Sequence, residues 1–358
     1  MRAIKIALTT LVLLLLSFSL WVYLTTYHPA PREPATLACQ ADMPVYDPAQ
    51  PLRVMVYNVQ FFAGKDYVFY YDLPDGIGPD LRPSTASIDA TLDGIADLIA
   101  AYNPDILLLQ EVNDGAAATD YHDQTAQLLE RLPNHDYGCV AEAFYWRAGY
   151  IPHPHIMGSV GMKLVTLSRY EINDAWRIQL PRMPMDIVSA QFYLKRAMLT
   201  TDLTTTEGDS IQLLNTHLDA FAQGSDTMQQ QVAMVHDTLS FLDQSETPWL
   251  LGGDLNLLAP GQRERLAPEQ RAYYVEPSEL EVLMEWDMVP SLVDIQTEPE
   301  RWYTHYPNDP RVAGPDRTID FLFHSHQWQV EHAEVVMGHN ALGLSDHLPI
   351  VVDLRLTE

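Results

Sequence analysis

Residues 249–258 read Trp-Leu-Leu-Gly-Gly-Asp-Leu-Asn-Leu-Leu, an apolar run interrupted by a carboxylate, Asp254, and an amide, Asn256. Short apolar runs bounded by turn residues are typical of buried strands. Glycines let the backbone come close to a ligand, and residues two apart on an extended strand point to the same side. The stretch therefore predicts a strand that ends in a functional site. The alternative is an Asx turn that caps the strand.

Five further fragments place a polar group at the edge of an apolar run. They are Val-Met-Val-Tyr-Asn58, Ile-Leu-Leu-Leu-Gln-Glu111, Leu-Leu-Asn-Thr-His217, Thr-Ile-Asp320-Phe-Leu-Phe and Leu-Ser-Asp346-His347. Polar groups at such positions are costly to bury unless they are paired or bind an ion. The set predicts one metal-assisted active site at the rim of a sheet.

The residue types indicate how such a site would be divided. Asn58, Glu111 and Asp346 offer hard oxygen ligands, which suit Mg²⁺, Mn²⁺ or Ca²⁺. Asp320 is flanked by apolar residues and needs a partner, for which His347 is the candidate; such a pair fixes the imidazole tautomer and raises its basicity.

Together, the six fragments resemble the endonuclease/exonuclease/phosphatase superfamily over about residues 52–356. The matching motifs are Asn58, Gln110-Glu111, Thr216-His217-Leu218, Gly253-Asp254-Leu255-Asn256, Ile319-Asp320 and Ser345-Asp346-His347. That superfamily includes deoxyribonuclease I-like nucleases, abasic-site endonucleases, neutral sphingomyelinases and inositol-polyphosphate 5-phosphatases. The resemblance implies an α/β fold, a four-layer α/β/β/α sandwich of two packed mixed sheets, and Mg²⁺-dependent cleavage of phosphate esters by water.

The resemblance also implies roles for the residues at these motifs. Metal binding is implied for Glu111 and Asn58, with Asp346 nearby, and water positioning or deprotonation for Asp254. Binding of the scissile phosphate is implied for Asn256 and His217. His347, oriented by Asp320, is implied as the essential imidazole, either as a base or as a phosphate ligand. For the family's substrate-side tyrosine, the candidates are Tyr145 and Tyr150.

Charge separates the substrate classes. The 358 residues carry a net charge of −27, whereas proteins that grip duplex nucleic acid usually present a basic face. The run Thr-His217-Leu-Asp-Ala resembles the sphingomyelinase type, so a lipid head group is a candidate substrate. An extracytoplasmic DNA or RNA endonuclease is the alternative, and a non-catalytic membrane-anchored binding module is the third reading. The oligomeric state stays open.

The N-terminus predicts a membrane anchor. Residues 6–24 contain no charge and follow Arg2 and Lys5, and at 1.5 Å per residue they just span a bilayer core of ~30 Å. We expect a signal anchor and transmembrane helix at 1–27, a proline-rich linker at 28–51 and a catalytic domain at 52–358, on the extracytoplasmic side. Secretion after signal cleavage is the alternative.

Apolar spacing predicts helices near 88–99, 123–132, 226–242 and 278–287. Residues 145–156 are expected to form an aromatic, histidine-rich loop, either as a lipid-facing or substrate lip or as ordinary packing. Cys39 and Cys139 form one disulfide in an oxidising compartment or remain two free thiols.

Overall fold

Two seven-stranded sheets pack face to face in this computed structural model, which describes residues 2–65, 67–73, 76–79, 82–132, 137–220 and 222–357. Within that part of the chain the first sheet has the order β1 (Arg32–Pro34), β7 (Ile172–Gln179), β8 (Ala197–Thr204), β9 (Ser210–His217), β10 (Trp249–Asp254), β12 (Asp320–His324), β11 (Asp287–Val289). The second has the order β13 (Trp328–Val335), β14 (Ile350–Leu356), β3 (Leu52–Asn58), β4 (Ile106–Asn113), β6 (Gly158–Ser168), β5 (Cys139–Ile151), β2 (Thr36–Cys39).

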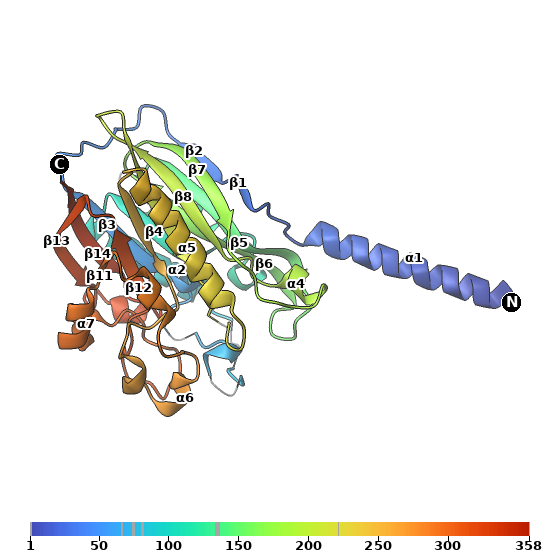
Figure 1. The fold of residues 1–358 in the computed structure, drawn as a ribbon. Coiled ribbons are helices and arrows are strands. Elements are labelled where there is room, and N and C mark those ends of the chain that lie inside the picture. The colour runs from blue at the N-terminus through green and yellow to red at the C-terminus, as the bar shows by residue number, and fades with distance from the viewer. Residues whose placement is uncertain are drawn as a thin grey trace.

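Helices cover the outer faces of this sandwich (Figure 1). The α-helices are α1 (Arg2–Thr25), α2 (Thr85–Tyr102), α3 (Gln124–Arg131), α4 (Ser189–Phe192), α5 (Thr227–Gln244), α6 (Pro268–Arg271), α7 (Leu292–Thr297) and α8 (Pro299–Trp302). Short 3-10 turns are η1 (Gln60–Phe62), η2 (Tyr70–Asp72), η3 (Ala117–Thr119), η5 (Arg263–Arg265), η6 (Glu279–Leu283) and η7 (Ala341–Gly343). The four-layer α/β/β/α arrangement expected from the sequence is confirmed.

The two long amphipathic helices bury the stripes that their spacing predicts. In α2 the buried face includes Ile88, Leu92 and Ile95, and in α5 it includes Val232 and Leu239. Ser84 caps α2, because its side chain accepts a hydrogen bond from the backbone N–H of Ser87. Packing of these faces on the sheets completes one continuous core between the layers.

Helix α1 is long and apolar enough to cross a membrane, with a mean hydropathy of 2.2, and it projects away from the body (Figure 1). The chain then returns to the sandwich directly. Strand β1 pairs with β7 in the first sheet, and β2 pairs with β5 in the second. The proline-rich segment 28–51 therefore supplies an edge strand to each sheet.

A disulfide joins Cys39 to Cys139, which face each other across β2 and β5. It covalently fixes the segment after α1 to the edge of the second sheet. Of the two alternatives for these cysteines, the structure has the disulfide.

Two local expectations are wrong. Residues 145–151 form the end of β5 rather than a loop, because buried Ala141, Ala143 and Tyr145 alternate with more exposed neighbours and so follow the period of a strand. The helix expected at 278–287 is only the short turn η6, followed by strand β11. In both segments, the aromatic or apolar composition obscured the backbone pattern.

Two contacts hold the sheets together near their polar ends. The Gln110 side-chain amide donates a 2.8 Å hydrogen bond to Asn215 Oδ1, and Asn215 in turn donates to the carbonyl of Leu109 at 3.1 Å. Beside them Gly252 lies so close to the second sheet that a Cβ would be 2.6 Å from Val56 Cγ2 and 2.7 Å from Leu108 Cδ1. From the sequence, this glycine was expected to let a ligand approach the backbone. Instead, its lack of a side chain lets the second sheet pack closely.

We therefore expect Gly252→Ala to lower the free energy of unfolding by ~1–3 kcal/mol, because overpacking a tight core forces side chains or sheets apart. Gly314→Ala is the matched control, since a Cβ there meets no atom within 4 Å. Chemical denaturation of both variants measures the difference. Equal unfolding free energies for Gly252→Ala and the wild-type chain would contradict this account of the sheet contact.

Candidate functional site

Three strand ends of the first sheet place polar side chains in one row. In the parallel pair β9–β10 the partner of Asp254 is His217, and in the antiparallel pair β10–β12 it is Asp320. The row thus runs His217, Asp254, Asp320 across three adjacent strands. All three residues are buried.

The second sheet brings Asn58 and Glu111 to the same edge. Asn58 pairs with Gln110 across the parallel strands β3 and β4, and the register of β4 against β6 shifts between Leu109 and Val112. Glu111 lies in that irregularity with a φ of 59°, a left-handed conformation that is unfavourable for a non-glycine residue. A bulge of this kind re-aims a side chain, and here it contributes a carboxylate to the site.

The segment before β14 is tied to the end of β3. Ser345 Oγ donates to the carbonyl of Asn58 at 2.9 Å and accepts from the backbone N–H of His347 at 3.1 Å. The backbone N–H of Asp346 donates to Gln60 Oε1 at 3.3 Å. These hydrogen bonds hold Asp346 and His347 over the row from the first sheet.

His347 and Asp320 form the buried pair that the sequence suggested. His347 Nδ1 lies 2.8 Å from Asp320 Oδ2, and Nε2 faces Asp254 Oδ2 at 3.5 Å. Burial alone would lower the pKa of His347, but the charges of Asp320 and Asp254 raise it well above its usual range. Both ring nitrogens of His347 thus face carboxylates, Nδ1 toward Asp320 and Nε2 toward Asp254, an arrangement that favours the protonated imidazole.

Asp254 is at the centre of the hydrogen-bond network. Its Oδ2 accepts from Asn58 Nδ2 at 3.0 Å, and its Oδ1 accepts from the backbone N–H of Asn256 at 2.9 Å. Burial raises the pKa of Asp254 to about 7, with His347 acting in the opposite direction. A carboxylate with a pKa near neutrality can take a proton from water at physiological pH.

His217 completes the row as a neutral imidazole. Burial, followed by the charges of Arg196 and His347, lowers its pKa well below the usual range. Its Nε2 lies 3.2 Å from Asp254 Oδ2, and Nδ1 lies 3.3 Å from the hydroxyl of Tyr145. These contacts are satisfied when the Tyr145 hydroxyl donates to Nδ1 and Nε2–H donates to Asp254. Tyr145 is thus at the site.

Asn256 reaches the site by a different route from the one expected. Strand β10 ends at Asp254, and Asn256 has a φ of 52°, so the argument from an extended strand is wrong. The hydrogen bond from its N–H to Asp254 makes an Asx-type turn, the alternative drawn from the sequence. Its Nδ2 donates to the carbonyl of Leu218 at 3.2 Å, and the residue lines the cavity.

Three carboxylates, Glu111, Asp346 and Asp72, lie near one another beside this row, and we call them the carboxylate wall. Burial raises the pKa of Asp346 to about 7, and Glu111 and Asp72 contribute to the rise. Asn308 Nδ2 is 3.3 Å from Asp346 Oδ2 and 3.4 Å from Asp72 Oδ2. Three half-buried carboxylates, Asp72, Glu111 and Asp346, fit a bound divalent metal with oxygen ligands. This donor set suits Mg²⁺.

Asn58 is oriented by its own loop. Its Oδ1 accepts from the backbone N–H of Gln60 at 3.0 Å, so Nδ2 points at Asp254 and, at 3.2 Å, at Glu111. In this orientation the amide links two carboxylates, whereas a metal ligand would present its oxygen. The ligand role expected for Asn58 stays a prediction.

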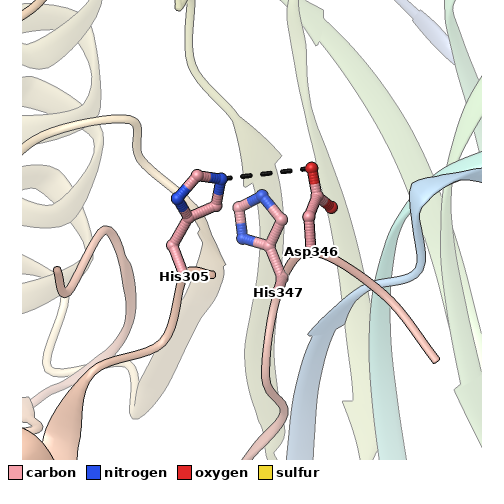
Figure 2. A group of neighbouring side chains, drawn as sticks. All are labelled: His305, Asp346 and His347. Atoms are coloured by element: carbon pink, nitrogen blue, oxygen red, sulfur yellow. Dashed lines mark ion pairs between the residues drawn. The ribbon is translucent and has the colours of Figure 1, made fainter. Parts of the chain in front are cut away.

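Sequence reasoning missed His305. Its ring lies 4.6 Å from that of His347, and its Nε2 is 4.0 Å from Asp346 Oδ2 (Figure 2). Burial, then the charge of His347, lowers the pKa of His305 well below its usual range. His305, Asp346 and His347 offer ligand atoms within 4.8 Å of one another. His347 Nδ1 is already held by Asp320, whereas Asp346, Glu111 and Asp72 offer oxygen atoms that suit a divalent metal.

Arg196 was also missed as a site residue. It is buried at the cavity wall, and its Nε has no hydrogen-bond partner among the described residues. Its guanidinium lies 5.2 Å from the centre of the Tyr145 ring. The sequence marked Lys195-Arg196 only as a basic pair, with nothing to show that both residues are buried just before β8. A buried unpartnered donor beside His217 is suited to an anionic oxygen.

A cavity of about 760 Å³ joins this polar row to an apolar region. The polar end is formed by Glu111, His217, Asp254, Asp346 and His347. The apolar end is formed by Trp146, Ile151, Ile156, Met185, Val188 and Phe192, from β5, the chain that follows it, and the α4 segment. One substrate can therefore place an anionic group and an apolar group in the same cavity.

Comparison with known proteins identifies relatives of this arrangement. Residues 55–347 match the model of the endonuclease/exonuclease/phosphatase family. A solved protein of that family from Beutenbergia cavernae is similar at 23% identity and a TM-score of 0.57, covering 86% of this chain and 72% of its own. A comparison with curated proteins gave no match.

Two further solved structures share the fold. The human Nocturnin catalytic domain, with bound sulfate, has 20% identity and a TM-score of 0.52, covering 90% of this chain and 98% of its own. A mannosyl-6-phosphatase from Bacteroides thetaiotaomicron has 17% identity and a TM-score of 0.51, covering 85% and 99%. At these identities the likeness concerns the fold.

We expect Asp320→Asn to lower the pKa of His347, because the substitution removes the charge that stabilises the imidazolium. NMR titration of the histidine rings measures this directly, and the protonated form should be lost at a lower pH than in the wild-type chain. Activity should fall ~10²-fold or more, in line with the usual size of one positioned acid or base.

Asp287→Asn is the matched control. Asp287 lies on β11 and faces His324, which is at the opposite end of β12 from Asp320. It should change the titration of His324 and leave that of His347 unchanged. An unaltered His347 titration in Asp320→Asn would contradict the assignment of Asp320 as its partner.

Proposed function

Because the chain belongs to the endonuclease/exonuclease/phosphatase family, we propose that it is a membrane-anchored, metal-dependent hydrolase of a phosphate ester that carries an apolar group. One observation carries this proposal: the buried row of His217, Asp254 and the His347–Asp320 pair opens into a cavity whose far end is apolar. Phosphate chemistry fits the first part, and an amphiphilic substrate fits the second.

In this proposal Asp254 orients the attacking water and accepts its proton, for which a pKa of about 7 is suitable. His347, kept protonated by Asp320, directs positive charge at the phosphoryl oxygens as negative charge develops there. Asn256 offers a neutral amide donor to the same group, and His217 does so when its Nε2–H turns from Asp254 to a phosphoryl oxygen. Each of these side chains is fixed by at least one hydrogen bond before substrate arrives.

Glu111 and Asp346 are the proposed metal ligands, with Asn58 as a third if its amide turns, and Asp72 adds negative charge at the same wall. A divalent cation such as Mg²⁺, or alternatively Mn²⁺ or Ca²⁺, supplies Lewis-acid stabilisation of the phosphoryl group when bound. The negative charge of Glu111, Asp346 and Asp72 would also attract a cation from water.

Substrate choice follows from charge and shape. The apolar lining of the cavity matches an alkyl or other apolar group better than the charged backbone of a polynucleotide. The net charge of −27 also opposes binding to nucleic acid. A nuclease is the second candidate, and the complete set of acidic, amide and imidazole groups speaks against a non-catalytic binding module.

The proposed location is outside the cytoplasm, with α1 as a signal anchor. Support comes from Arg2 and Lys5 at the start of the apolar helix, since positive charge favours the cytoplasmic side. The Cys39–Cys139 disulfide also fits, because disulfides persist mainly in oxidising compartments.

We expect the purified full chain to hydrolyse a lipid phosphodiester such as sphingomyelin, or a phosphoinositide, in the presence of Mg²⁺. A chelator should abolish turnover, and added Mg²⁺ should restore it, because the acidic wall requires a cation. Plasmid DNA is the competing substrate, and Asp254→Asn is the inactive control. Activity that survives in metal-stripped protein would refute the metal-dependent mechanism, and faster nicking of plasmid than lipid turnover would make the nuclease the better reading.

We expect Arg196→Met to raise KM by ~10-fold or more with a smaller effect on kcat, since a hydrogen bond to a charged group contributes about 1.5–3 kcal/mol. Arg355→Met is the control, because Arg355 is exposed and pairs with Glu331 away from the site. Steady-state kinetics on the same substrate measure both. An unchanged KM would remove Arg196 from the substrate site.

A further inference from the structure

We propose that the protein also touches the membrane with a second surface, formed by the chain between β5 and β6 and by the α4 segment, and that substrate enters through it. We call this the docking surface and define it by the side chains of Met157, Met185, Ile187 and Val188. Its occupant is the lipid bilayer that α1 enters. The inference rests on the proposed anchoring by α1, and it specifies how the proposed substrate reaches the site.

The docking surface is unusually apolar for a region in contact with water. Ile187 is 85% exposed, Met157 59%, Val188 55% and Met185 41%. Single exposed apolar residues are ordinary, but a group of large ones marks a site of contact with a protein or membrane. Ile187 and Val188 are consecutive and both exposed, so packing against the rest of the protein shields neither side chain from water.

The position of α1 identifies the partner as the bilayer. Near the C-terminal end of α1, the Trp21 ring lies 6.3 Å from that of Tyr150 on β5. Thr26 forms a β-bridge with Ala148, and the backbone N–H of Tyr27 donates to the carbonyl of Arg147. Tryptophan and tyrosine are enriched where a span leaves the hydrocarbon. The membrane boundary is therefore at the end of β5.

The docking surface lies at that same boundary. The hydroxyl of Tyr150 is 3.5 Å from the sulfur of Met157, which connects α1 to the chain between β5 and β6. Trp146 Nε1 donates to the carbonyl of Phe192 at 2.8 Å, which connects β5 to α4. Figure 1 shows α4 and the ends of β5 and β6 on the side of the body from which α1 projects.

The docking surface is also the mouth of the apolar end of the cavity. Met185 and Val188 are exposed to solvent and line the cavity as well. Behind them Phe192 and Ile151 continue the lining toward His217 and Asp254. A lipid whose phosphate lies at the row can therefore keep its apolar part in the cavity and the bilayer without crossing water.

Burial of apolar surface, rather than charge, holds the docking surface to the bilayer. Arg147 and Arg182 are the exposed cations beside it, and Asp186 lies within the same segment. In a chain with a net charge of −27, this local balance gives little attraction to anionic lipid. The contact should therefore form on zwitterionic lipid and resist salt, as apolar insertion does.

The test uses an environment-sensitive fluorophore at single cysteines in the full chain, reconstituted in phosphatidylcholine nanodiscs. The chain has only two cysteines, and they are bonded to each other, so an introduced cysteine is the single free thiol. Ile187→Cys and Met157→Cys carry the label on the docking surface. Val293→Cys is the matched control, because Val293 is 68% exposed on α7, at the far end of the body in Figure 1.

Labels at positions 187 and 157 should shift their emission to the blue and be quenched by brominated lipid, at low and high salt alike. The label at position 293 should show neither change. Emission at 187 and 157 that matches the control would overturn the docking surface. This readout needs no turnover, so insertion of the labels into lipid by a protein that cleaves no phosphate ester would sink the proposed function and leave the docking surface standing.

Discussion

The burial of several carboxylates beside one another is the constraint on which the site depends. Burial raises the pKa of Asp254 and of Asp346, and acidic neighbours add to the rise: Asp320 and Glu111 at Asp254, and Glu111 and Asp72 at Asp346. On one side, the protonated form of His347 compensates these negative charges, because its two ring nitrogens face Asp320 and Asp254. On the other side, His347 and Lys65 offset only part of the cost of ionising Asp346, whose pKa stays raised to about 7, and a divalent metal would supply the remaining positive charge.

The packing of the two sheets brings these acids together at one edge of the sandwich. Each sheet alone supplies half of the groups, so the site forms only when the polar ends of both sheets meet. Gly252 and the Gln110–Asn215 hydrogen bond set that approach, one by leaving room and the other by satisfying polar atoms inside the core. Core packing and chemistry are coupled here, because a small separation of the sheets would widen every distance across the site.

The sequence was informative where chemistry and strand ends coincide. Asp254, Asp320 and His347 follow or begin short apolar runs, so their convergence could be expected from pattern alone. His305 and Arg196 could not be found in this way. His305 sits in an irregular segment, and its position depends on long-range bridges to Arg317 and His347. Arg196 just precedes β8, and only the tertiary structure decides whether a cation there faces water or a cavity. Backbone conformation was equally hidden, as the left-handed turn at Asn256 shows.

The edge strands that follow α1 have a mechanical consequence. A flexible linker would let the body rotate freely relative to α1. Here β1, β2 and the Cys39–Cys139 disulfide attach the body to the chain that follows α1. In the proposed membrane-anchored form, the body would keep one orientation toward the bilayer as it diffuses. Encounters with the proposed lipid substrate would then become a two-dimensional search, in which the rate depends on the mole fraction of substrate in the leaflet rather than on its bulk concentration.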